Sequence, residues 1–269
     1  MDYIEFTDSE TDSNKNVDVS KLRLKKVQDI GPIQVWSVDG AKVRAVDNEF
    51  TNFGTHYGFE IIPEFEFWLD VESDENEREF FIEHMLVEWK LCRHGKDYIT
   101  ATTKGNSKEK AERKKCGDLS KVFDKKGSPH YDNIHKKLLG TTTEGLNVYR
   151  VDGRLVRSAF YIDFTEGGHD YVYDYVPKDE VWLDDDLVVA ELPFVAIHEI
   201  HERNLMKRGW KYDDAHGSAS TLEWTLRHHP EKIKESLGEL GIKDPTLLQE
   251  IGLSQEPLYI ELFRKLWSH

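Results

Sequence analysis

The stretch FTNFGTHYGFEIIPEFEFWLD, residues 50–70, recurs 114 positions later as FTEGGHDYVYDYVPKDEVWLD, residues 164–184. Phe, Thr, Gly, Tyr, Pro, Glu, Trp, Leu and Asp coincide in this alignment. Upstream, at an offset of 113, VWSVDGAKVRA (35–45) matches VYRVDGRLVRS (148–158). A repeat of this length is typical of a duplicated structural unit, so we expect both copies to share one fold.

The same register continues downstream without a gap. It pairs Phe80/Phe194, His84/His198, Glu88/Glu202, Leu91/Leu205, Gly95/Gly209, Tyr98/Tyr212, Ala101/Ala215, Glu109/Glu223 and Arg113/Arg227. The chain therefore divides into an acidic N-terminal tail (1–21), a first, degenerate copy (22–117), a linker (118–134), a second copy (135–230) and a C-terminal helical extension (231–269). The linker is rich in Lys, Gly, Ser and Asp, as flexible connections are.

Within each copy the pattern predicts strands first and helices afterwards. An Asp-Gly pair between two β-rich runs predicts a hairpin. The segments YVYDYVP and EVWLD alternate apolar and polar residues, which predicts two further strands around a proline-containing turn. A helix is expected at about 188–208, ended by Gly209, and a second from Asp213 or Asp214 to Pro230.

These elements define the predicted fold class. We expect an α+β protein built by tandem duplication of a small antiparallel sheet followed by two helices, with a C-terminal helical tail. In that tail, EPLYIELFRKLW is expected to form an apolar-faced helix that seals a core or the seam between the copies.

Composition limits the classes of partner. The 269 residues carry 36 Lys and Arg against 51 Asp and Glu, a formal charge of −15, so direct nucleic-acid binding is not expected. Only Cys92 and Cys116 are present, without zinc-finger spacing, which favours a reducing compartment. No apolar run approaches a membrane span, and the N-terminus is acidic and polar. We therefore expect a cytoplasmic protein with no membrane partner.

The second copy has ionisable residues that the first copy lacks. Glu199, His201 and His216 replace Met85, Val87 and Thr102 of the first copy, and His169 replaces Thr55. His198 and Glu202 are present in both copies, as His84 and Glu88. On a helix His198, His201 and Glu202 project to one side. Polar groups on an otherwise apolar face are costly to bury unless they are paired or bound to a metal.

The segment HEIHE (198–202) resembles the HExxH helix of zincin metallopeptidases, with Glu in place of the second His. The resemblance implies zinc, or another divalent metal, held by His198, Glu202 and, as in the gluzincin branch, a ligand from a later helix, here His216. Glu199 would be the general base. His201 could be a ligand instead of Glu202, or a partner to it.

Further expectations concern His169 and the function as a whole. His169 follows two glycines and could steady an oxyanion. The leading hypothesis is a zincin-like metal-dependent hydrolase, possibly a peptidase, acting on a peptide or small molecule, with the first copy covering its site.

The motifs VDG, DFTEGGH, WLDDD, HEIHERNLM, YDDAH and EW of the second copy also resemble proteins encoded by bacteriophages and mobile elements. This resemblance leaves open a non-catalytic protein that binds a protein partner. The negative charge permits a third hypothesis, an acidic decoy of a basic nucleic-acid-binding protein. The His/Glu pair could also be purely structural, anchoring Arg113 or Arg227.

Overall fold

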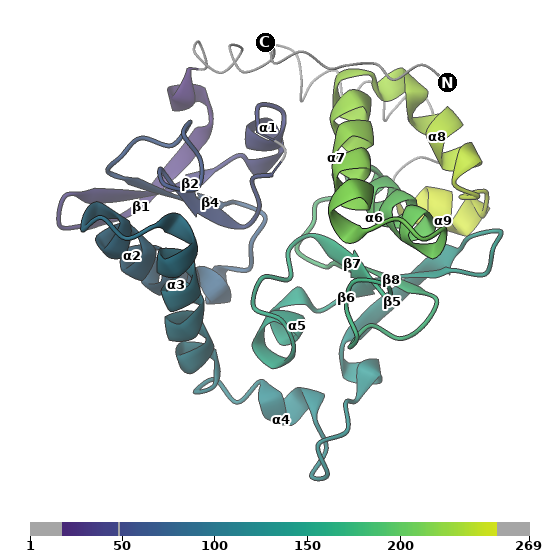
Figure 1. The fold of residues 1–269 in the computed structure, drawn as a ribbon, viewed down its shortest axis with the longest axis horizontal. Coiled ribbons are helices and arrows are strands. Elements are labelled where there is room, and N and C mark those ends of the chain that lie inside the picture. The colour runs from purple at the N-terminus through teal and green to yellow at the C-terminus, as the bar shows by residue number, and fades with distance from the viewer. Residues whose placement is uncertain (1–17, 48, 252–269) are drawn as a thin grey trace.

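The computed structural model describes residues 18–47 and 49–251, which form two similar units side by side (Figure 1). The first copy contains β1 (Arg23–Ile30), β2 (Ile33–Val38), α1 (Gly40–Arg44), β3 (Phe53–Thr55), β4 (Glu66–Asp70), α2 (Arg78–Arg93) and α3 (Tyr98–Arg113). The second copy repeats this order with β5 (His135–Thr141), β6 (Asn147–Val151), α5 (Gly153–Ala159), β7 (Gly167–His169), β8 (Glu180–Asp184), α6 (Leu192–Lys207) and α7 (Tyr212–His228).

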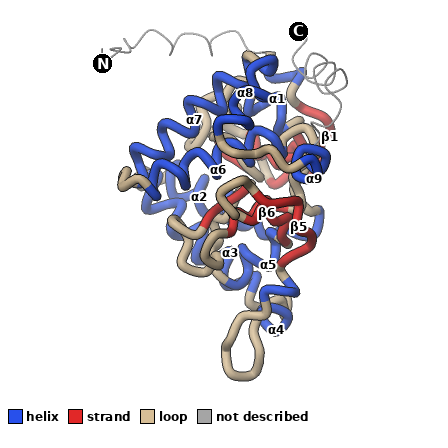
Figure 2. Tube along the Cα trace, turned by 90° about the vertical axis from the view of Figure 1, so that its right-hand side faces the viewer, coloured by secondary structure: helices blue, strands red, loops and turns tan. Residues whose placement is uncertain are grey.

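Shorter elements lie outside the copies. Helix α4 (Leu119–Val122) belongs to the linker and projects with its loop from one end of the molecule (Figure 2). Helices α8 (Ile233–Glu239) and α9 (Pro245–Glu250) follow the second copy, and their residues Ile233, Leu237 and Leu247 join its buried core. The segment EPLYIELFRKLW lies outside the described residues. None of the described helices combines the length and the apolar character needed to cross a membrane.

The sheets confirm the α+β class and the duplication. Their strand orders are β1-β2-β4-β3 and β5-β6-β8-β7. The outer pairs are antiparallel, as expected, but β2 and β4 run parallel, as do β6 and β8, so each sheet is mixed. Thr55 pairs with Phe67 and His169 with Val181, so the alignment of Thr55 with His169 holds without a slip.

The prediction of a hairpin at Asp-Gly was wrong, because each Asp begins a helix. Asp39 accepts a hydrogen bond from Lys42 N at 3.3 Å to cap α1, and Asp152 accepts one from Leu155 N at 2.9 Å to cap α5. The glycine makes room for a carboxylate, since a Cβ on Gly153 would lie 2.0 Å from Asp184 Oδ2. The turn between β1 and β2 is instead made at Gly31, with φ +60°.

The strand predicted for YVYDYVP was also wrong, whereas the strand at EVWLD is confirmed as β8. Residues 171–177 form turns, and their aromatic rings pack on one another: Tyr175 stacks on Tyr173 at 5.1 Å and on Phe160 at 4.9 Å. The alternating apolar residues here belong to a loop whose aromatic rings pack inward. A period of two residues alone does not distinguish such a loop from a strand.

Both long helices of the second copy are confirmed, with shifted starts. Helix α6 begins at Leu192 after Glu191, and Gly209 follows its end with φ +93°. Helix α7 begins at Tyr212, which places Asp213 and Asp214 in its first turn, where carboxylates suit the helix dipole.

Two buried arginines join the copies. Arg44 of α1 donates to Glu191 of the second copy, Nε to Oε2, at 2.6 Å, and Arg157 of α5 donates to Glu77 of the first copy, Nε to Oε1, at 3.0 Å. Each arginine also pairs with a carboxylate of its own copy, Asp70 and Asp184. The repeat aligns Arg44 with Arg157 and Glu77 with Glu191, so the two ion pairs between the copies are equivalent and the seam has pseudo-two-fold symmetry. We call these two arginines and two glutamates the seam pairs.

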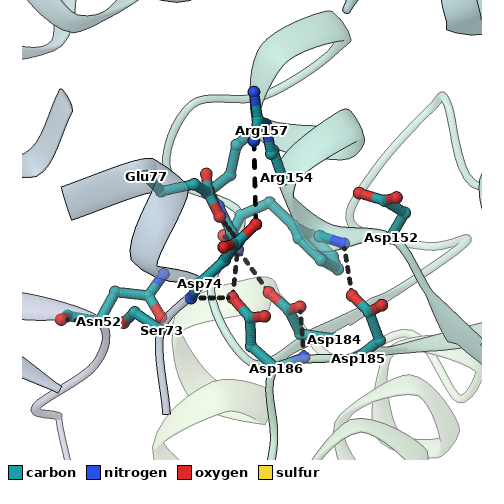
Figure 3. Close-up of polar contacts among 12 residues, drawn as sticks. Asn52, Ser73, Asp74, Glu77, Asp152, Arg154, Arg157, Asp184, Asp185 and Asp186 are labelled. Atoms are coloured by element: carbon teal, nitrogen blue, oxygen red, sulfur yellow. Dashed lines mark hydrogen bonds and ion pairs between the residues drawn. The ribbon is translucent and has the colours of Figure 1, made fainter. Parts of the chain in front are cut away.

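The three consecutive aspartates 184–186 belong to this seam. Figure 3 shows Glu77, Asp184 and Asp186 converging on Arg157. Asp186 Oδ2 also accepts a hydrogen bond from Asp74 N at 3.0 Å, and Asp185 lies 3.7 Å from Lys136 Nζ. Of the three, Asp186 contacts the first copy, whereas Asp184 and Asp185 pair with cations of their own copy. The three carboxylates also lie close enough together to form a second group that could hold a metal ion.

We expect Arg157→Ala to lower the free energy of unfolding by about 3–5 kcal/mol, because it leaves buried carboxylates without their cation. Lys136→Ala, which removes a partly exposed pair with Asp152, should cost less than about 1 kcal/mol. Urea unfolding at pH 7 measures both. A loss below about 1 kcal/mol for Arg157→Ala would contradict this account of the seam.

Candidate metal centre

Helices α6 and α7 bring three predicted ligands together. His198 and Glu202 lie one turn apart on α6, and His216 lies on α7, which packs against α6. His198 Nε2 is 3.3 Å from His216 Nδ1 and 3.5 Å from Glu202 Oε2. His216 Nδ1 is 2.8 Å from the same Glu202 oxygen. The donor atoms of residues far apart in sequence therefore converge on one point.

These separations suit a divalent metal. Ligand atoms 2.0–2.1 Å from a tetrahedral zinc ion lie about 3.4 Å from one another, close to the two longer distances here. Two imidazoles and one carboxylate are an accepted ligand set for catalytic zinc and for non-haem iron. The chain thus contains a His/Glu group that could hold a metal ion.

His198 is oriented by a buried carboxylate. Its Nδ1 donates to Glu223 Oε2 at 2.8 Å, because a carboxylate only accepts, and this leaves Nε2 directed at the cluster. Burial raises the pKa of Glu223, but Arg227 and His198 outweigh burial and lower it to about 2. Such a carboxylate behind a ligating imidazole fixes its orientation and raises its basicity.

Glu202 is held from its other side by His169. His169 is fully buried; its Nε2 donates to Glu202 Oε1 at 3.0 Å and its Nδ1 accepts from Tyr171 N at 3.2 Å. Burial raises the pKa of Glu202, yet hydrogen bonds from three imidazoles lower it well below its usual range. Because both nitrogens of His169 have partners, its contacts favour positioning Glu202 over the oxyanion contact, which stays a prediction.

The acidic surroundings favour a cation between these side chains. Hydrogen bonds that His216 donates to the carboxylates of Glu202 and Glu49 raise its pKa to about 9. Glu49 belongs to the first copy and lies 3.9 Å from His216 Nε2. A metal ion would take the place of the proton that these carboxylates otherwise stabilise.

Glu199 lies beside the cluster in a space made by a glycine. One of its carboxylate oxygens is within 4.8 Å of ligand atoms of both His169 and Glu202. A Cβ on Gly167 would lie 2.9 Å from Glu199 Cγ, so this position has room for Glu199 only because it lacks a side chain. Burial raises the pKa of Glu199 to about 7, the range in which a general base works at neutral pH.

A cavity of about 290 Å³ opens onto these groups. Its wall includes His198, Glu199, Glu202 and His216, and the first copy contributes Glu49 and Thr51. The cluster is therefore reached from a cavity to which both copies contribute.

His201 is not brought to the cluster. Its Nε2 lies 3.0 Å from Ser218 Oγ on α7, and burial lowers its pKa. Among the described residues, the groups that could hold a metal include His198, Glu202, His216 and His169 but not His201. Of these two residues of α6, Glu202 is therefore the one placed where it could hold a metal ion together with His198 and His216.

The first copy has the carboxylate that orients its histidine, but it lacks the additional imidazoles of the cluster. His84 Nδ1 donates to Glu109 at 3.0 Å, as His198 does to Glu223. Glu88, however, accepts hydroxyl hydrogen bonds from Thr55 at 2.5 Å and Thr102 at 3.0 Å where the second copy has imidazoles. The structural interpretation of the His/Glu pair fits both copies as far as the arginine, since His84 is linked through Glu109 to Arg113 and His198 through Glu223 to Arg227. The added imidazoles are what distinguish the second copy.

Two residues at the site were not among the predicted ones, Glu223 behind His198 and Gly167 beside Glu199. The repeat did align Glu109 with Glu223 and Arg113 with Arg227, and this register was a signal that could have linked Glu223 to the neighbouring His198. Gly167 could have been found by its counterpart: Phe53 and Met85 of the first copy occupy the positions of Gly167 and Glu199.

No family model, curated protein or solved structure matches this chain.

The first copy predicts a pH dependence of stability. Burial lowers the pKa of His84, but Glu109 and Glu88 outweigh burial and raise it from 6.5 to about 9. Its stabilising contribution is therefore fully present below pH 6.5 and is lost as pH rises through about 9. Relative to His84→Gln, the wild type should lose on the order of 1–3 kcal/mol across this range. Urea unfolding at several pH values measures the difference; parallel curves for both proteins would contradict it.

Proposed function

We propose that the protein is a metal-dependent hydrolase, zincin-like in its α6 helix, with its site in the second copy. The observation that carries the proposal is the convergence of His198 Nε2, Glu202 Oε2 and His216 Nδ1 beside Glu199 in an open cavity. The first copy, which shares the fold, has Thr102 and Met85 in place of His216 and Glu199. This difference associates the extra ionisable residues with chemistry rather than with folding.

Each residue has a distinct part in the proposed reaction. A divalent ion, when bound, would supply Lewis-acid activation of water at neutral pH. His198, Glu202 and His216 would hold the ion, and Glu223 and His169 orient the first two of these. Glu199 accepts the proton of the attacking water and passes it to the leaving group.

The reaction class follows from these parts. The water oxygen forms a bond to an acyl carbon, the bond from that carbon to the leaving nitrogen or oxygen breaks, and the proton held by Glu199 completes the leaving group. Amides, peptides and esters of a size that fits the cavity are the substrate classes consistent with this scheme.

Metal content tests the centre directly. We expect about one zinc per wild-type chain after loading and dialysis, and loss of that metal in His198→Ala and His216→Ala, since each removes one of three ligands. The repeat supplies controls: His84→Ala and Thr102→Ala change the equivalent positions of the first copy and should retain the metal. Elemental analysis gives the stoichiometry, and circular dichroism confirms that each variant is folded. A metal-replete wild type without bound metal would remove the hydrolase proposal.

The base is tested separately from the metal. Glu199→Gln should retain the metal and lower the rate of hydrolysis by about 10²–10⁴-fold, because the amide cannot accept the proton. Gly167→Ala should give a smaller loss, since its Cβ displaces Glu199 without touching a ligand. Rates on a panel of amide and ester substrates measure both effects. Unchanged rates for Glu199→Gln would show that Glu199 is not the base.

The other hypotheses predict different results. A non-catalytic protein of the phage or mobile-element type would bind a protein partner with no dependence on Glu199. An acidic decoy would associate with a basic protein in a salt-sensitive way and would be indifferent to chelators.

A further inference from the structure

A continuous chain of buried charged contacts runs from the first copy to the metal centre. His198 Nδ1 donates to Glu223, and Arg227 Nε donates to the other oxygen of Glu223 at 2.9 Å. Arg227 also pairs with Glu191, Nη1 to Oε2, at 2.9 Å. Glu191 in turn accepts from Arg44 Nε at 2.6 Å. Four contacts thus connect an arginine of the first copy to a ligand in the second.

The members of this chain have little access to water. Glu191 is 0% exposed, Arg44 and Arg227 are each 1% exposed, and Glu223 is 5% exposed. Water therefore cannot replace a lost partner without rearrangement, and each contact depends on the next. The side chain of Arg44 is also fixed, because its guanidinium reaches Asp70 at 2.7 Å and Glu72 at 2.8 Å.

We propose that Arg44 is a positioning residue for the metal centre of the second copy, acting through Glu191, Arg227 and Glu223 on His198. This inference rests on the metal centre proposed above. Glu191 lies between two guanidinium groups, and Arg227 is shared between Glu191 and Glu223. When the Arg44 guanidinium is removed, Arg227 is the remaining partner of Glu191 and its contact with Glu223 weakens. Glu223 then no longer fixes the orientation of the His198 imidazole.

A second series of buried charged contacts, related to the first by the repeat, leads to His84, the counterpart of His198 in the first copy. Arg157 pairs with Glu77, Glu77 with Arg113 at 2.5 Å, and Arg113 with Glu109 at 2.8 Å; Glu109 then accepts from His84 at 3.0 Å. Arg157 is as buried as Arg44 and holds the same seam. Arg157 lies in the second copy, but the series of contacts that starts from it ends at His84 of the first copy. The two arginines therefore separate an effect on the metal centre from an effect on the seam.

The test compares Arg44→Lys with Arg157→Lys in the full chain. Lysine keeps the charge but cannot place a planar fork on several carboxylates. We expect both variants to lose similar stability in urea, because both weaken the seam. Only Arg44→Lys should lower zinc affinity, by about tenfold, the lower end of the range for partners behind metal ligands. Arg157→Lys should stay within about twofold of wild type on the same measure.

Zinc affinity is measured by competition with a chromogenic chelator, and the visible spectrum of the cobalt-loaded protein reports the geometry of the ligands. A change of that spectrum in Arg44→Lys alone supports positioning, since a loss of stability does not by itself alter it. If Arg44→Lys does not fold, Glu191→Gln against Glu77→Gln makes the same comparison one step closer to each site.

The outcomes distinguish the two proposals. Equal zinc affinity and identical spectra in the two variants would overturn the role of Arg44 and leave the metal centre intact. A wild-type protein that binds neither zinc nor cobalt would overturn the metal centre, and the role of Arg44 with it.

Discussion

The reciprocal exchange of buried arginines across the seam is the constraint on which the arrangement of this protein depends. A guanidinium without a counter-charge is very costly to bury, and here each copy supplies the carboxylate that the other copy's arginine needs. The carboxylates, Glu191 and Glu77, immediately precede the α6 and α2 helices. Because these helices carry the His/Glu pairs, the contact that joins the copies also sets the position of the helix in each site.

The two copies surround the same His/Glu pair with different side chains. The first copy retains a buried His84, Glu88 and Glu109 network closed by threonine hydroxyls, which satisfies its polar groups. The second copy has imidazoles and a carboxylate in place of those hydroxyls and apolar groups. The neighbouring residue differs in size as well. Gly167 lies beside Glu199 in the second copy, whereas the first copy has Phe53 and Met85 at these positions, and Phe53 packs on Phe81 at 4.7 Å. A cavity lies beside the His/Glu pair in both copies, of about 240 Å³ in the first and about 290 Å³ in the second. The shared framework therefore accommodates either threonine hydroxyls or imidazoles around that pair.

Local sequence signals were reliable where a single element decided the outcome. The helices around HEIHE and YDDAH, the β8 strand and the stop at Gly209 all follow from periodicity and turn chemistry. Asp-Gly was misread because the same dipeptide suits a hairpin and a helix N-cap, and the choice depends on the carboxylate of Asp70 or Asp184 that lies against the glycine. YVYDYVP was misread because its aromatic rings pack on Phe160, a contact outside the segment. The parallel pairing of β2 with β4 is likewise a long-range choice.

The sequence by itself determined the duplication, the α+β class and the placement of His198 and Glu202 on one helical face. Those features follow from a repeated register and from the pitch of a single helix. The packing of α7 on α6 decided that His216 joins His198 and Glu202, whereas His201 turns to Ser218, because only the tertiary structure sets which side chains of the two helices converge. The tertiary structure also decided that His169 donates to Glu202 and that Arg44 donates to Glu191. These residues are far apart in the sequence, and no local pattern predicts which of them lie close together in space.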